Sequence, residues 1–185
     1  MTPDMTLVIT GFGAACHLSP DTGALWARLV ARHAGLKPEA PFDTAAFRAR
    51  NNTITDPAAV RATLAARAPA LAAHLPEDPP RGLIYGLAAA AEALTMAGLA
   101  PGGAALPDGI GLSLGTTSGS DFDRFAAGAP GIDPALASPD GVITALAAAL
   151  GLNGPRAQIS NACTSSAAAI VQGAAMILSG RAETV

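Results

Sequence analysis

Cys163 has the residue type and the position that covalent chemistry requires. It lies in the segment ISNACTSS, residues 159–166, where a short strand-like run ends and a long apolar helix-like run begins. Unpaired amides at the start of a helix favour a thiolate over a thiol. The same amides, including that of Cys163, can face the oxygen that becomes negative when a thioester carbonyl is attacked. This segment therefore predicts a nucleophilic cysteine that accepts an acyl group.

A simpler interpretation competes with this one, because a free cysteine in an apolar chain is most often a small buried residue. Position alone leaves nucleophile and core residue equally open for Cys163. Cys16 has no helix start after its expected strand, so we expect it in the core. His33 and His74 lie near charged residues and are expected at the surface, whereas His17, at a strand end, is a weak candidate for lining a site. No Cys/His cluster has metal-ligand spacing, so no metal is expected.

The composition describes one globular domain, residues 1–185. Half of the residues are apolar, 14% are charged and the net charge is -3, which argues against DNA or RNA as a partner. Few aromatic residues are present, so we expect a core of small residues. Two cysteines without CxxC spacing indicate a reducing, cytoplasmic setting, and no segment has the roughly 18 uninterrupted apolar residues of a membrane span. Asp121, Asp123 and Asp133 are interpreted as loop residues rather than as an acid-base pair.

Strand-like and helix-like segments alternate along the chain. The expected strands are 6–12, 109–114, 157–160 and an incomplete one at 182–185; the expected helices are 22–32, 58–74, 81–98, 141–151 and 164–179. We expect helix 22–32 to cross back over the sheet and residues 119–140 to be irregular. This alternation predicts an α/β layered fold with a mainly parallel sheet.

The expected helix 164–179 is apolar around nearly its whole circumference. A helix of this kind must be buried on all sides, whereas one sheet can cover only one face of it. We therefore expect residues 1–185 alone to expose a large apolar patch on this helix. Such a chain should be marginally stable or should associate through that face.

Residues 149–185, ALGLNGPRAQISNACTSSAAAIVQGAAMILSGRAETV, closely resemble the active-site stretch of β-ketoacyl synthases. In that family a Gly-Pro turn, a short strand, an Ala-Cys-small-Ser elbow and an apolar helix follow one another in this order. The segments VITGFGAACHLSP, LWARLVARHAGL, PFDTAAF, EALTMAGL and IGLSLGTTSG resemble further landmarks in family order. The resemblance covers almost all of the chain and places Cys163 on the acyl-accepting cysteine of the family.

The resemblance implies the thiolase-like αβαβα layered fold, of which this chain would be the amino-terminal half. It implies that Cys163 takes an acyl chain from a carrier-protein thioester and that a malonyl-carrier then decarboxylates and attacks it. This is the chemistry of fatty-acid and polyketide-type synthesis. An acyl carrier protein, whose phosphopantetheine holds the substrates, is the implied partner, and no separate cofactor is implied. A homodimer, formed by antiparallel pairing of the strand 157–160, is implied, and pairing with a synthase-like subunit is the alternative.

Basic side chains are concentrated in the first third of the chain. Residues 1–70 hold seven basic and five acidic side chains, whereas residues 71–185 hold four basic and nine acidic ones. We expect an acidic carrier protein to dock on this basic surface, with Arg61 and Arg67 as candidates, although charged helix residues are more often simply solvated.

The sequence also departs from the family pattern. The two His and the nearby Lys used for decarboxylation, and a second oxyanion donor, come from the second half in the family, and none of the three His present matches them. Glu77-Asp78-Pro79-Pro80 stands where family members often carry a basic and Met-Asp pattern, and residues 119–140 are compact. We therefore expect that residues 1–185 alone cannot carry out condensation, and the acyl chain length stays open.

Two other interpretations are compatible with the resemblance. The chain could be a non-catalytic partner subunit of the chain-length-factor type, but those partners usually lack the cysteine found here at Cys163. It could also be a thiolase-like acyltransferase, which the elbow and the Phe42-Asp43-Thr44 region disfavour.

Overall fold

The computed structural model describes residues 6–37, 43, 45–48, 51, 53, 55–99, 101, 106–117 and 134–185. The three aspartates Asp121, Asp123 and Asp133, and Pro41, Phe42 and Thr44 of the PFDTAAF segment, lie outside the described residues. The elements are α1 (Thr22–Val30), α2 (Pro57–Arg67), α3 (Pro69–Ala72), α4 (Arg81–Met96), β1 (Leu112–Gly115), α6 (Pro134–Ala137), α7 (Pro139–Leu150), β2 (Arg156–Ile159), the 3₁₀ turn η1 (Ala162–Thr164) and α8 (Ser165–Leu178).

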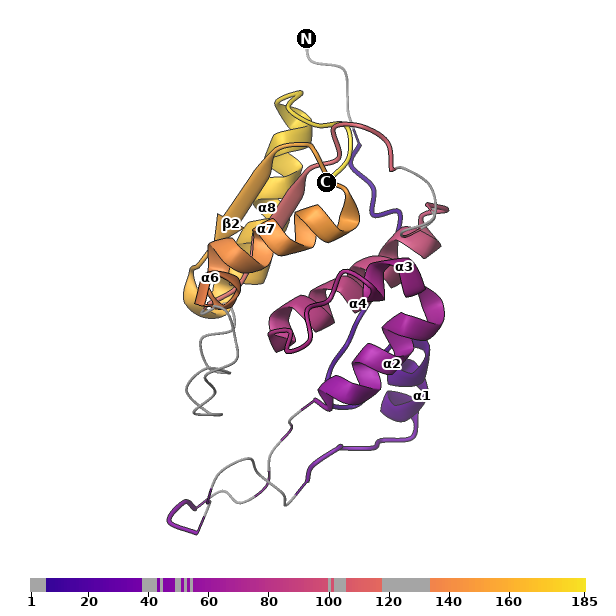
Figure 1. Ribbon diagram of the computed structural model, residues 1–185, viewed down its shortest axis with the longest axis vertical. Helices are drawn as coiled ribbons and strands as arrows, with labels where there is room; N and C mark the ends of the chain where they lie inside the picture. Colours follow the sequence, from indigo (N-terminus) through magenta and orange to yellow (C-terminus); the bar gives the residue numbers. More distant parts are fainter. Residues whose placement is uncertain are drawn as a thin grey trace.

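A two-stranded parallel sheet lies between the helices α7 and α8 (Figure 1). β1 and β2 pair from Leu112 opposite Arg156 to Gly115 opposite Ile159. Successive side chains of a strand point to opposite faces. Ser113 faces α8, where its hydroxyl donates to the carbonyl of Ala169 at 2.8 Å. Leu112 and Leu114 pack instead against the hydrophobic core that contains α7. The helix–sheet–helix layers predicted from the alternating pattern are therefore present.

The core joins α4 to its neighbours α2 and α7 and is built from aliphatic side chains. Among the described residues its buried members include no aromatic side chain, as the composition predicted, but leucine contributes more than the smaller residues expected. The members below 5% exposure are Val60, Leu64, Ala68, Leu71, Leu83, Ile84, Leu87, Ala91, Val142, Leu146 and Ala147. Burying a leucine contributes about 1.5–3 kcal/mol, so this cluster is the main source of stability for α2, α4 and α7.

The strand expected at residues 6–12 is wrong. The segment pairs with no strand in the described part of the chain, and Val8 and Ile9 are 74% and 84% exposed. Its backbone instead runs against α4: a Cβ on Gly13 would lie 2.1 Å from the carbonyl oxygen of Ala89. β-branched residues form a strand only where a neighbouring strand completes the ladder, and the structure shows none beside this segment in the described part of the chain.

Other expectations hold in part. α1 does not cross the sheet; it lies beside α2 (Figure 1), and none of its residues is buried. Residues 58–74 form two helices, because Ala68 leaves the helical region before Pro69. Residues 182–185 do not form a strand, although the Gly111 amide donates to the Thr184 carbonyl at 2.9 Å. The predicted helices at 81–98, 141–151 and 164–179 are confirmed as α4, α7 and α8 within a few residues.

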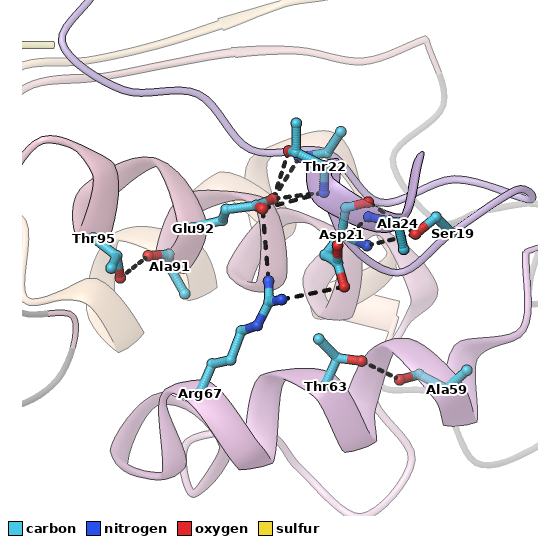
Figure 2. Close-up of polar contacts among 11 residues, drawn as sticks. Ser19, Asp21, Thr22, Ala24, Ala59, Thr63, Arg67, Ala91, Glu92 and Thr95 are labelled. Atoms are coloured by element: carbon cyan, nitrogen blue, oxygen red, sulfur yellow. Dashed lines mark hydrogen bonds and ion pairs between the residues drawn. The ribbon is translucent and has the colours of Figure 1, made fainter. Parts of the chain in front are cut away.

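Glu92 of α4 holds the N-terminal segment and α1 in place (Figure 2). Its carboxylate accepts hydrogen bonds from the amide of Ala14 at 3.2 Å, from the amide of Thr22 at 3.1 Å and from the Thr22 hydroxyl at 2.7 Å. Arg67 of α2 bridges Glu92 at 3.6 Å and Asp21 at 3.2 Å. Asp21 also caps α1 by accepting from the amide of Ala24 at 2.8 Å. A single carboxylate of α4 thus joins the N-terminal segment, the start of α1 and Arg67 of α2.

This network changes the interpretation of the two docking candidates. Arg67 is half exposed but is paired with two carboxylates of the same chain. Arg61 donates to the Glu77 carbonyl at 3.2 Å, so it too has an internal partner. Both docking candidates thus have partners within the chain, and docking of a carrier on them stays a prediction.

We predict that Glu92→Ala lowers the free energy of unfolding by about 2–3 kcal/mol, because it leaves partly buried amides without their charged acceptor. Arg67→Ala should cost less than about 1 kcal/mol, since its side chain is half exposed and solvent screens the pairs. Glu183→Ala, which removes an exposed carboxylate, is the matched control. Urea unfolding measures all three. Equal stability of the Glu92 and Glu183 variants would contradict this role for Glu92.

Candidate active site

Cys163 lies in the 3₁₀ turn η1 between the end of β2 and the first residue of α8. It is an exposed, free thiol. The preceding residue, Ala162, has φ of 47°, in the left-handed region that costs a residue with a side chain about 1–2 kcal/mol. Residues held in such conformations are concentrated at functional sites, where their surroundings compensate for the cost. The strained turn brings the chain from strand to helix with Cys163 at its tip.

Ser165 supplies that compensation from inside the turn. Its side chain is buried, with the residue 3% exposed. The hydroxyl accepts a hydrogen bond from the Asn161 amide at 2.8 Å and donates one to the Ala162 carbonyl at 2.7 Å. The Thr164 hydroxyl adds a bond to the Asn161 carbonyl at 2.8 Å. The turn that carries Cys163 is therefore closed by two hydroxyl side chains that follow this residue and bond to the backbone before it.

The segment that follows β1 is bonded to the same turn. The Thr116 amide donates to the Ile159 carbonyl at 3.0 Å, which extends the strand pairing by one residue. The Ser160 hydroxyl donates to the Thr117 carbonyl at 2.9 Å, and the Thr117 hydroxyl donates to the Ala162 carbonyl at 3.3 Å. The ends of both strands thus position the cysteine turn.

Gly115, the last residue of β1, lies close against the start of α8. A Cβ at this position would lie 2.3 Å from the Ser165 carbonyl oxygen and 2.7 Å from the Ser166 amide nitrogen. Real side chains do not approach backbone so closely, so the start of α8 requires glycine here. Sequence reasoning missed the structural roles of Gly115 and Ser165. The signals that could have indicated them are a glycine that ends a strand and a serine two residues after the cysteine.

This arrangement suits attack on a carbonyl group. The Cys163 thiol is accessible, and its amide makes no hydrogen bond to the described part of the chain. The amide is therefore available to an oxygen held beside the sulfur. α8 begins two residues later, and its positive end favours negative charge near the thiol.

The other residues considered from the sequence lie elsewhere. Cys16 is partly exposed and not in the core, because it sits in a turn paired with Ser19 rather than on a buried strand. Cys16, His17 and His33 line a hollow of about 420 Å³ beside α2. His74 lines a second hollow, of about 350 Å³, with residues of α7. Neither hollow includes Cys163, so the structure does not bring a histidine of these hollows to the thiol.

One face of α8 is not covered by the described residues. Ser165, Ala169, Gly173 and Met176 are buried against the rest of the chain. On the other side Ile170, Val171 and Leu178 are 71%, 69% and 59% exposed. This confirms the expectation that one sheet covers one side of this helix and that an apolar patch is left open.

Within the described ranges, the side chains form no group of three or more His, Cys, Asp or Glu suited to a metal ion. None of the described helices combines the length and apolar character needed to cross a membrane.

Comparison with known proteins was made on sequence and on structure. The β-ketoacyl synthase N-terminal domain family matches residues 5–185. No curated protein matches the chain. Among solved structures, the ishigamide ketosynthase/chain length factor is similar with a TM-score of 0.69 and 25% identity over 95% of this chain.

Two further solved structures share the fold at 20% identity and 95% coverage of this chain. One is a β-ketoacyl synthase from Burkholderia phymatum, with a TM-score of 0.65. The other, with a TM-score of 0.56, is a type II PKS acyl-carrier protein in complex with its ketosynthase bound to the hexaketide. The chain spans less than half the length of each of the three, 44%, 44% and 48%.

We predict that Gly115→Ala lowers the free energy of unfolding by about 1–3 kcal/mol, as overpacking against backbone does. It should also change the reactivity of Cys163 towards iodoacetamide, because the start of α8 must move. Gly23→Ala is the matched control: its Cβ would meet nothing closer than 3.5 Å, so it should leave both properties unchanged or slightly raise stability. If Gly115→Ala matched the control in both measurements, the close approach would have no consequence for the turn.

Proposed function

Because the chain belongs to the β-ketoacyl synthase family and corresponds to its N-terminal domain, we propose that Cys163 is the acyl-accepting nucleophile of a β-ketoacyl-acyl-carrier-protein synthase. The observation that carries this proposal is the exposed thiol at the tip of a strained strand-to-helix turn, beside an amide that has no partner in the described chain. A buried core cysteine would need neither the strain nor the accessibility.

The first step is acyl transfer. The Cys163 sulfur, as thiolate, attacks the carbonyl carbon of an acyl thioester, and a new carbon–sulfur bond forms. The carbonyl oxygen becomes negative and is stabilised by the Cys163 amide. The carbon–sulfur bond to the carrier then breaks, and the departing carrier thiolate takes up the proton that Cys163 lost. The acyl group is left on Cys163.

The second step is condensation. Loss of CO₂ from a malonyl thioester gives a carbanion equivalent, which forms a carbon–carbon bond to the acyl carbonyl carbon on Cys163. The bond from that carbon to the Cys163 sulfur breaks, so Cys163 leaves as thiolate and a β-ketoacyl thioester two carbons longer stays on the carrier. This step needs donors that stabilise the developing enolate. His17, His33 and His74 line hollows that do not include Cys163. We therefore propose that residues beyond this chain's own histidines, supplied by a second synthase half, provide these donors.

The open face of α8 supports the same partnership. Contiguous exposed apolar side chains on a protein mark an interaction surface, and Ile170, Val171 and Leu178 are exposed along the helix that follows the cysteine turn. We propose that a second synthase half, or another synthase-like subunit, covers it. An acyl carrier protein is the proposed substrate carrier, and one structural neighbour is a ketosynthase in complex with its acyl-carrier protein.

A second candidate function is a chain-length-factor-type partner, which the pairing named in the ishigamide ketosynthase/chain length factor favours. A partner of that type would shape the acyl pocket of a complete synthase without being acylated. The retained thiol of Cys163 favours the catalytic role, and acylation of that thiol separates the two functions.

We predict that, in an assembly completed by a second synthase half, an acyl-carrier thioester acylates Cys163 and no other residue. Intact-mass analysis should show one added acyl group on the chain without substitutions and none on Cys163→Ala. Cys16→Ala is the matched control and should be acylated normally, since Cys16 lies in a turn without a helix start.

Two results would count against the proposal. An acyl group retained in Cys163→Ala would mean that another residue is the nucleophile. If the chain without substitutions is never acylated while the assembly still makes product, that result would favour the chain-length-factor-type role.

A further inference from the structure

The Ala162–Cys163 peptide group has an unusual set of partners. Its carbonyl oxygen accepts hydrogen bonds from the Ser165 hydroxyl at 2.7 Å, from the Ser165 amide and from the Thr117 hydroxyl at 3.3 Å. A carbonyl oxygen has two lone pairs, so three donors saturate it. The N–H on the other side of the same peptide group, that of Cys163, has no partner in the described chain.

The directions of the C=O and the N–H of one peptide group are fixed relative to each other. A trans peptide is planar, and its C=O and N–H point in opposite directions; no cis peptide bond occurs in the described chain. Donors that hold the carbonyl of Ala162 therefore also aim the amide of Cys163. The left-handed φ of Ala162, 47°, turns this peptide group away from the orientation that would continue β2.

Hydrogen bonds to the carbonyl oxygen of this peptide group also polarise its N–H. Hydrogen bonds polarise one another along a chain, so an amide whose oxygen accepts bonds is a stronger donor at its nitrogen. The bond from Ser165 is short and comes from a buried side chain, whereas the bond from Thr117 is longer and comes from an exposed one. Ser165 should therefore have the larger effect and Thr117 the smaller.

We propose that Ser165 and Thr117 are positioning residues for acyl transfer, which aim and polarise the Cys163 amide towards the oxygen that becomes negative. Neither side chain touches the reacting atoms; both act through the carbonyl of Ala162. This inference rests on the proposed function of Cys163, and it assigns to two hydroxyl groups the preparation of the amide that the reaction uses.

A purely structural role for the same hydroxyls would have a different consequence. If they only kept the turn folded, their loss would change every reaction of the Cys163 thiol alike. If they prepare the amide, their loss slows only reactions in which an oxygen becomes negative. Acylation by a thioester develops such an oxygen, whereas alkylation by iodoacetamide displaces iodide from carbon and does not. The ratio of the two rates therefore distinguishes the roles.

The experiment measures both rates at Cys163 in the complete synthase assembly, using the hexanoyl thioester of N-acetylcysteamine and iodoacetamide. Ser165→Ala should slow acylation by roughly ten- to a hundredfold, less than removing an oxyanion donor outright, and alkylation by less than about twofold. Thr117→Val should slow acylation by roughly two- to fivefold, because the hydrogen bond that it removes is longer. Thr117→Ser keeps the hydroxyl and should acylate at the rate of the chain without substitutions. Ser166→Ala, on the next, exposed residue, is the matched control and should change neither rate.

Each outcome decides the proposal. Equal loss of both rates, or unchanged acylation in Ser165→Ala and Thr117→Val, would overturn it while leaving Cys163 as the nucleophile. If Ser165→Ala does not fold, the Thr117 pair decides alone, because the exposed Thr117 side chain can be changed without opening the core. Absence of any acyl group on Cys163 in the unmodified assembly would overturn this inference and the proposed function together.

Discussion

Ala162 adopts a backbone conformation that residues with side chains normally avoid, and the surrounding hydrogen bonds offset the cost. The buried Ser165 hydroxyl bonds both to the Asn161 amide and to the Ala162 carbonyl, so it closes the turn from within. Each such bond contributes about 1 kcal/mol, comparable to the strain it opposes. The direction of the Cys163 amide depends on this closed turn.

The same turn restricts what can pack around it. Gly115 must lack a side chain, because the start of α8 lies against its backbone. Farther along α8, a Cβ on Gly173 would lie 3.2 Å from the Val185 side chain, so the middle of the helix also packs closely. Close packing on one side leaves Ile170, Val171 and Leu178 open on the other. One side of α8 is thus covered by this chain, and the other side is the surface that we propose a second synthase half covers.

Local patterns predicted those parts of the molecule that local interactions determine. Helices α4, α7 and α8, strands β1 and β2 and the cysteine turn follow from apolar periodicity and from turn residues near each end. Residues 6–12 have strand composition, but their structure depends on whether a strand or a helix lies beside them, which no local pattern states. The place of α1 depends on Glu92, 70 residues from Thr22. The sequence shows that Ser165 has a hydroxyl. It does not show that the left-handed backbone of Ala162 brings two backbone groups within hydrogen-bond distance of that hydroxyl.

The central claim is that the turn at Cys163 both presents a nucleophile and holds an amide ready for the oxygen of the acyl group. A crystal structure of the complete assembly, trapped with an acyl group, tests this claim most directly. We expect a thioester on the Cys163 sulfur, with its carbonyl oxygen about 3 Å from the Cys163 amide nitrogen and with Ser165 still bonded to the Ala162 carbonyl. An acyl group on another residue, or an acyl oxygen on Cys163 directed away from that amide, would contradict it.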